Sequence, residues 1–130
     1  EYLDQEIHFV NRVPYSEMKN FYDKFDVLLN CSLRDSGCFV VMEAMSRGLP
    51  VICVDAGGPK VNTTSDSAIK IEPAPMNMMI QKVTEAIEVL ANDSTKRVEM
   101  GRKARAHAMK NFLISERTKQ MNCYYEEARK

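Results

Sequence analysis

Two carboxylates lie close together in the stretch RDSGCFVVMEAMSRGLPVICVD, residues 34–55. Asp35 stands at its start, and Glu43 follows eight positions later, inside an apolar segment. A carboxylate in such a segment needs a partner, because a buried charge without one is costly. Sugar or ribose hydroxyls are suitable partners, since carboxylate oxygens accept hydrogen bonds from them.

An anion site is predicted between the two carboxylates. The apolar spacing predicts a helix over residues 38–47, and Gly48 followed by Pro50 is typical of a helix end. The first backbone N–H groups of a helix have no partner within it and bind phosphate groups well. The residues expected to form this anion site, which suits a phosphate or diphosphate, are Ser36, Gly37, Cys38, Phe39 and Val40.

Both carboxylates also have a structural explanation that needs no ligand. Asp35 could cap the N-terminus of the predicted helix, where a negative charge is favourable. Glu43 could pair with Arg47, one helical turn further on. The spacing by itself leaves the functional and the structural explanations equally open.

These residues are expected on a framework of short strands that alternate with helices. Apolar runs bounded by turn residues predict four strands, at residues 7–10, 26–32, 50–54 and 68–72. The strands at 26–32 and 50–54 are continuous apolar runs, of the kind that is buried on both faces. Apolar residues at helical spacing predict five helices, at residues 15–25, 38–47, 76–91, 93–110 and 115–129.

Capping and turn residues mark the ends of these elements. Ser16 and Ser115 are expected to cap the first and last helices, and Asp93 or Ser94 is expected to begin the helix over residues 93–110. The sequence DAGGP at residues 55–59 predicts a tight turn.

Strands joined in this order by helices and short loops run parallel, because each connection crosses over the sheet. The sequence therefore predicts an α/β fold. An open, parallel, Rossmann-like sheet is expected over residues 1–75, followed by a helical tail over residues 76–130. Ligands bind such sheets outside the carboxyl ends of the strands, and the strand at 26–32 leads directly into Asp35.

Composition limits the kinds of function. The chain has 130 residues, of which 45% are hydrophobic, and 18 basic side chains balance 18 acidic ones. This balance argues against a nucleic-acid-binding protein but allows a small anionic ligand. The four cysteines form no C-x-x-C pair and the two histidines have no ligand-like spacing. We therefore expect no metal site and a reduced, cytoplasmic chain.

The segments VNRVPYSEMKNFYDKFDVLLNCSLRDSG and VMEAMSRGLPVICVDAGGP together resemble the donor-binding domain of the retaining glycosyltransferases of family 4 (group 1), which have the GT-B fold. The resemblance implies transfer of a sugar from a nucleotide-diphosphate donor with retention at the anomeric carbon. It implies no obligatory metal and no other cofactor, since amide dipoles and basic side chains stabilise the leaving group. It also implies a role in polysaccharide synthesis and allows a peripheral membrane association of the whole protein.

This resemblance implies a role for each candidate residue. Asp35 takes the catalytic position that contacts the donor sugar near its reacting carbon, and Glu43 holds the donor ribose. The anion site cradles the diphosphate, while Arg12 and Val13 line the base pocket. Three residues depart from the family pattern, namely Asp35 in place of the usual glutamate, and Cys38 and Asn11 in place of the usual glycines. Cys38 is either a reactive thiol or a passive substitution.

The resemblance also implies partner segments that these 130 residues lack, namely an acceptor-binding domain and the first strands of the donor domain. We therefore expect the chain alone to be inactive and to self-associate through open sheet edges. The alternative is a non-catalytic interaction module that keeps the donor-domain fold. A Rossmann-like epimerase is disfavoured because no G-x-G-x-x-G follows a strand.

Overall fold

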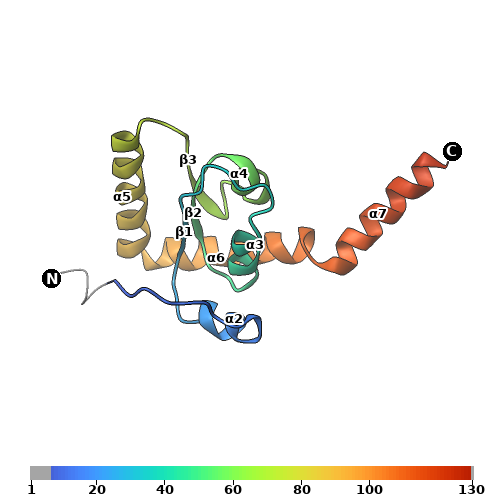
Figure 1. Cartoon of the computed structure of the whole chain (residues 1–130), viewed down its shortest axis with the longest axis horizontal. Helices are drawn as coiled ribbons and strands as arrows, with labels where there is room; N and C mark the ends of the chain where they lie inside the picture. The colour runs from blue at the N-terminus through green and yellow to red at the C-terminus, as the bar shows by residue number, and fades with distance from the viewer. Residues whose placement is uncertain (1–6, 130) are drawn as a thin grey trace.

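A three-stranded parallel sheet forms the centre of the computed structural model, which describes residues 7–129 (Figure 1). Its strands are β1 (Leu28–Asn30), β2 (Val51–Val54) and β3 (Ala68–Ile71), in the order β1-β2-β3. Helices α3 (Phe39–Ser46) and α4 (Gly57–Asn62) make the two crossovers that parallel pairing requires. The α/β class and the parallel sheet are therefore confirmed.

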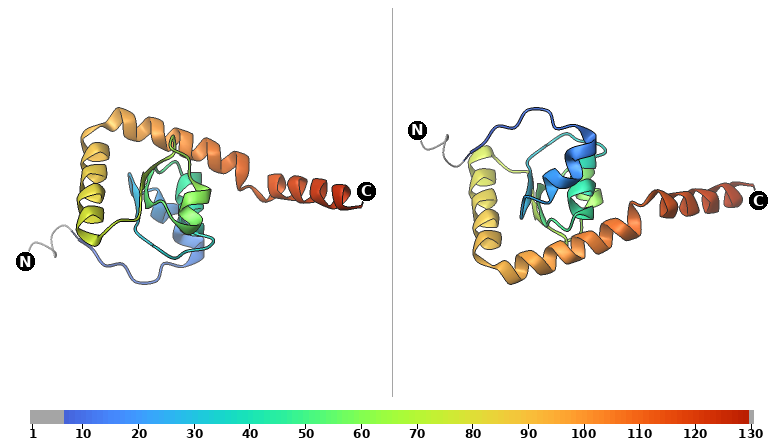
Figure 2. Two further views of the ribbon diagram at one scale, coloured as in Figure 1. Left: turned by 90° about the horizontal axis from the view of Figure 1, so that it is seen from above. Right: turned by 90° about the horizontal axis from the view of Figure 1, so that it is seen from below.

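The remaining helices surround this sheet. They are α2 (Tyr15–Tyr22), α5 (Met76–Asn92), α6 (Ser94–Asn111) and α7 (Ile114–Ala128). Helices α5 and α6 meet at a corner and enclose the sheet on two sides (Figure 2). Helix α7 projects away from the body and buries none of its residues. No helix within residues 7–129 is long and apolar enough to cross a membrane.

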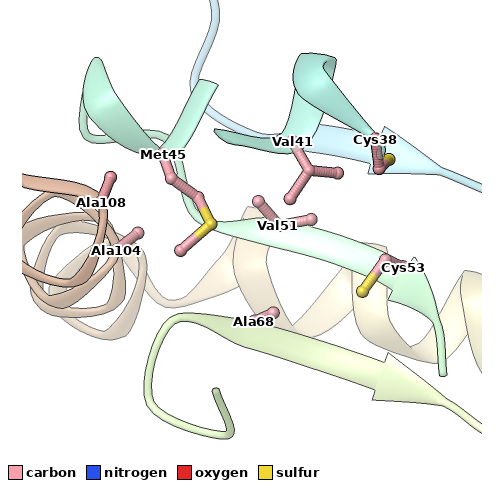
Figure 3. Close-up of a cluster of buried hydrophobic side chains, with 8 residues drawn as sticks. All are labelled: Cys38, Val41, Met45, Val51, Cys53, Ala68, Ala104 and Ala108. Atoms are coloured by element: carbon pink, nitrogen blue, oxygen red, sulfur yellow. The ribbon is translucent and has the colours of Figure 1, made fainter. Parts of the chain in front are cut away.

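Strand β2 joins the two main parts of the hydrophobic core. Its successive side chains point to opposite faces of the sheet, so Val51 and Cys53 pack on one side and Ile52 on the other. The first cluster also takes residues from α3 and α6, as Figure 3 shows for Met45 and Ala104. All four residues of β2 are buried, which confirms the prediction of a strand covered on both faces at 50–54.

Two strand predictions are wrong. Residues 7–10 form no strand and are exposed, because no described strand lies beside them to complete the hydrogen bonds of a ladder. The strand predicted at 26–32 is shorter and is not buried on both faces. It lies at the edge of the sheet as β1, where Leu29 remains 44% exposed.

The DAGGP segment begins a helix and is more than a turn. Helix α4 starts at Gly57, whose φ of 53° lies in the left-handed region that glycine adopts easily. A Cβ at Gly57 would lie 2.5 Å from the carbonyl oxygen of Asp35. The two glycines of this segment therefore allow the start of α4 to approach the loop between β1 and α3.

Some helix ends lie where the sequence predicts them and others do not. Gly48 ends α3 with a φ of 83°, and the Asp93 side chain accepts a 2.8 Å hydrogen bond from the Lys96 N–H at the start of α6, as expected. Ser16 and Ser115 are not caps, because α2 and α7 begin one residue before them. Helix α2 also ends at Tyr22, three residues earlier than predicted.

Candidate functional site

Asp35 lies in the loop that connects β1 to α3, at the carboxyl end of the sheet. Its Oδ1 accepts a 2.7 Å hydrogen bond from the Cys38 N–H, so its side chain caps the start of α3. Its carbonyl oxygen accepts a 2.6 Å hydrogen bond from the Gly58 N–H, which fixes the loop against α4. The structural explanation for Asp35 is therefore correct. Its Oδ2 has no hydrogen-bond partner among residues 7–129, which leaves that oxygen available to a ligand.

The anion site is smaller than the sequence predicts. The Cys38 N–H is already bound to Asp35 and is not available to a ligand, whereas the Ser36 N–H has no partner among residues 7–129. The backbone N–H groups of Gly37, Phe39 and Val40 have no partner in the described part of the chain. Phe39 and Val40 are also exposed, whereas Gly37 is half-buried.

Cys38 is a passive substitution. It stands immediately before α3 with a φ of 47°, a left-handed conformation that costs energy for any residue other than glycine. The side chain is 2% exposed, and its burial together with the nearby Asp35 raises the pKa of Cys38 to about 11. A buried thiol with a raised pKa is unreactive, so the alternative of a reactive thiol at this helix start is wrong.

Glu43 projects from the exposed face of α3, on the same side as Val40, which lies one turn earlier. Its Oε2 accepts a 2.9 Å hydrogen bond from the hydroxyl of Tyr22. The structural explanation for Glu43 required a pair with Arg47, and this pair does not form. The Arg47 guanidinium instead donates to both carboxylate oxygens of Asp23, at 2.6 and 2.8 Å.

A cavity of about 380 Å³ opens beside Glu43, between α2 and α3. Four of the five α2 residues that line it follow the spacing i, i+3, i+4, i+7, which places them on one face of that helix. Glu43 Oε1 reaches solvent here, because it has no hydrogen bond and is not among the fully buried unpaired oxygens of residues 7–129. The lining residues are Tyr15, Ser16, Met18, Lys19, Tyr22, Glu43, Ser46 and Arg47.

The structure brings Glu43 and the unpaired N–H groups of α3 to one surface, but it does not place every candidate there. Arg12 is exposed and Val13 half-buried in the segment before α2, and neither lines the cavity. Their role at a base pocket stays a prediction. The α2 face was missed, although the helical spacing of Tyr15, Met18 and Tyr22 could have indicated it.

Several known proteins have sequences related to this chain. The sequence profile of the family described as "Glycosyl transferases group 1" matches residues 2–107. A D-inositol 3-phosphate glycosyltransferase of Corynebacterium aurimucosum is 26% identical over 94% of this chain and 28% of its own length. A trehalose synthase of Pyrococcus horikoshii is 32% identical over 85% of this chain and 25% of its own length.

A third relative matches only the central segment. The GDP-mannose-dependent alpha-mannosyltransferase of Mycobacterium tuberculosis is 43% identical over 44 residues, which are 34% of this chain and 12% of that protein. The chain thus spans about a quarter of the length of the first two relatives and a smaller part of the third. Because the family profile extends over most of the chain, from the segment before α2 to near the end of α6, the chain is a member of the group 1 glycosyl transferases.

Proposed function

We propose that this chain is the donor-binding part of a retaining glycosyltransferase and binds a nucleotide-diphosphate sugar. One observation carries the proposal. Glu43 leaves one carboxylate oxygen open to a cavity, one helical turn from backbone N–H groups that have no partner in the described chain. Hydroxyl groups suit the first feature and phosphate oxygens the second.

The proposed ligand occupies three points along the start of α3. Its diphosphate accepts hydrogen bonds from the N–H groups of Gly37, Phe39 and Val40, where the helix dipole favours negative charge. Its ribose donates to Glu43 in the cavity. Its sugar lies toward Asp35, whose Oδ2 is available at the carboxyl end of the sheet.

The names of two relatives support a nucleotide-sugar donor. The mannosyltransferase of Mycobacterium tuberculosis and a monoacylated phosphatidylinositol monomannoside mannosyltransferase of Corynebacterium glutamicum are both named as GDP-mannose-dependent. The second is 27% identical over 81% of this chain. These names support the class of donor, while the base, the sugar and the acceptor of this protein remain to be measured.

Leaving-group charge is proposed to be stabilised by the amide dipoles of α3, with retention at the anomeric carbon and without an obligatory metal. Within residues 7–129 no three His, Cys, Asp or Glu side chains lie together as a metal-binding group. A metal requirement is tested directly by assaying transfer with and without a chelator.

The test uses the full-length protein with a panel of UDP-, GDP- and ADP-sugars. Wild type is compared with Glu43→Ala and with Asp35→Asn, which keeps an oxygen to cap Cys38 but removes the charge. We expect transfer from one donor, loss of that transfer in both variants, and roughly tenfold weaker donor binding in Glu43→Ala. A folded protein that binds no donor would favour the non-catalytic interaction module. Variants that transfer as well as an active wild type would show that Asp35 and Glu43 do not bind the donor.

A further inference from the structure

The Glu43 carboxylate is held in position by a buried tyrosine, Tyr22. Tyr22 is 6% exposed, and its ring packs in a small cluster with Ala44 and Leu49 at the junction of α2 and α3. Its hydroxyl donates the 2.9 Å hydrogen bond to Glu43 Oε2. Because packing fixes the ring, the position of the hydroxyl is fixed as well.

Because of this hydrogen bond, the two carboxylate oxygens of Glu43 have different surroundings. Oε2 is occupied by Tyr22, and Oε1 remains open to the cavity. Burial and the neighbouring Glu43 both raise the pKa of the Tyr22 hydroxyl. The hydroxyl therefore stays protonated at neutral pH and remains a donor there.

A free glutamate side chain loses conformational entropy when it binds a ligand. A glutamate that is already held in its binding geometry loses less, and its ligand binds more tightly. Tyr22 supplies this restraint from α2, 21 residues away in the sequence. Arg47 lies one helical turn from Glu43 but does not restrain it, because its guanidinium is bound to Asp23.

We propose that Tyr22 is a positioning residue that orients Glu43 for recognition of the ribose hydroxyls of the donor. This inference rests on the proposed function, since it requires that Glu43 bind a ribose. It adds a residue of α2 to a site whose other polar groups come from α3 and the loop before it.

The neighbouring residue offers a matched control. Asp23 follows Tyr22 and binds Arg47 at 2.6 and 2.8 Å, so it also ties α2 to α3. Asp23 does not line the cavity and does not contact Glu43. Asp23→Asn therefore weakens the contact between the two helices, keeps one oxygen that accepts from Arg47, and leaves the Tyr22–Glu43 hydrogen bond in place.

The experiment measures binding to the full-length protein of two probes. One is the nucleoside diphosphate of the donor found in the panel, and the other is its 2′,3′-dideoxy analogue. Tyr22→Phe keeps the buried ring and removes only the hydroxyl. We expect the preference for the ribose form to fall roughly fivefold to tenfold in Tyr22→Phe, with the affinity for the dideoxy form unchanged. Asp23→Asn is expected to keep the wild-type preference.

A second measurement places Tyr22→Phe in the Glu43→Ala background. We expect no further loss of ribose preference there, because the hydroxyl acts through Glu43. Additive losses would overturn the inference, as would a wild-type preference in Tyr22→Phe or an equal loss in Asp23→Asn. If Glu43→Ala itself keeps the wild-type preference, the proposed function fails first. If it loses the preference and Tyr22→Phe does not, only the role of Tyr22 fails.

Discussion

Single residues in this chain carry both structural and proposed functional roles. Asp35 caps α3 with one carboxylate oxygen, and Glu43 binds Tyr22 with one of its own. In each case the second oxygen is left without a partner in the described chain. A carboxylate can thus stabilise the local fold with one oxygen and accept a hydrogen bond from a ligand with the other, because both oxygens are acceptors.

The four cysteines differ enough in burial to be told apart chemically. We expect iodoacetamide at mildly alkaline pH to modify the exposed Cys31 and Cys123 in the native protein, while Cys38 and Cys53 react only after unfolding. Burial raises the pKa of both protected thiols, so the reactive thiolate is scarce as well as inaccessible. Peptide mass spectrometry before and after addition of denaturant checks this. If Cys38 were labelled in the native protein as fast as Cys31, this would contradict the burial of the Cys38 side chain at the start of α3.

At the scale of elements, α6 is the helix that packs most extensively against α3. Its small residues Gly101, Ala104 and Ala108 are all buried, and the last two pack against the cluster that contains Met45 and Val51 (Figure 3). Short side chains let the backbone of α6 approach α3 and the turn that follows it. This approach fixes α3, and with α3 the positions of Glu43 and of its unpaired N–H groups.

Gly101 is the closest point of that approach. A Cβ there would collide with the carbonyl oxygen of Gly48 and lie 3.3 Å from Pro50 Cδ. We expect Gly101→Ala to destabilise the protein by about 1–3 kcal/mol, because backbone rather than a flexible side chain must move. This loss would appear although alanine favours a helix by about 1 kcal/mol over glycine. Urea unfolding checks it.

The control for helix propensity is Ala106→Gly, at an exposed position of the same helix. It should cost about 1 kcal/mol, which is the propensity difference alone. A Gly101→Ala protein that is more stable than wild type would show that α6 does not pack tightly against the turn at Gly48.

At the scale of the whole molecule, the sheet has an open edge. β1 pairs with β2 on one side and with no other described strand, and Leu29 is exposed there. A mainly apolar cavity of about 380 Å³, lined among others by Val27, Leu29 and Ile87, lies beside this edge. Unpaired strand edges with apolar side chains favour pairing with another strand.

We therefore expect the 130-residue chain by itself to self-associate as its concentration rises. Leu29→Lys should reduce the association, because a charge at an edge strand opposes pairing. Val61→Lys, at an exposed apolar residue of α4, serves as the control and should leave it unchanged. Light scattering or sedimentation equilibrium measures the mass. A monodisperse wild-type monomer at every concentration would rule out association through this edge.

The sequence alone determined the features that depend on neighbouring residues. Apolar continuity predicted the buried β2, and capping residues correctly placed Gly48 at the end of α3 and Asp93 at the start of α6. The combination of motifs in the segments VNRVPYSEMKNFYDKFDVLLNCSLRDSG and VMEAMSRGLPVICVDAGGP indicated the glycosyltransferase family, which the profile match confirmed. Local propensity and spacing carry this information, because each signal spans only a few turns of chain.

Only the tertiary structure decided which distant residues become partners. Glu43 is bound to Tyr22 rather than Arg47, and residues 7–10 form no strand although their sequence suits one. A strand needs a second strand beside it, and a half-buried carboxylate accepts a hydrogen bond from whichever donor the packing of the helices brings near. Both outcomes depend on contacts between segments far apart in the sequence, which no local pattern encodes.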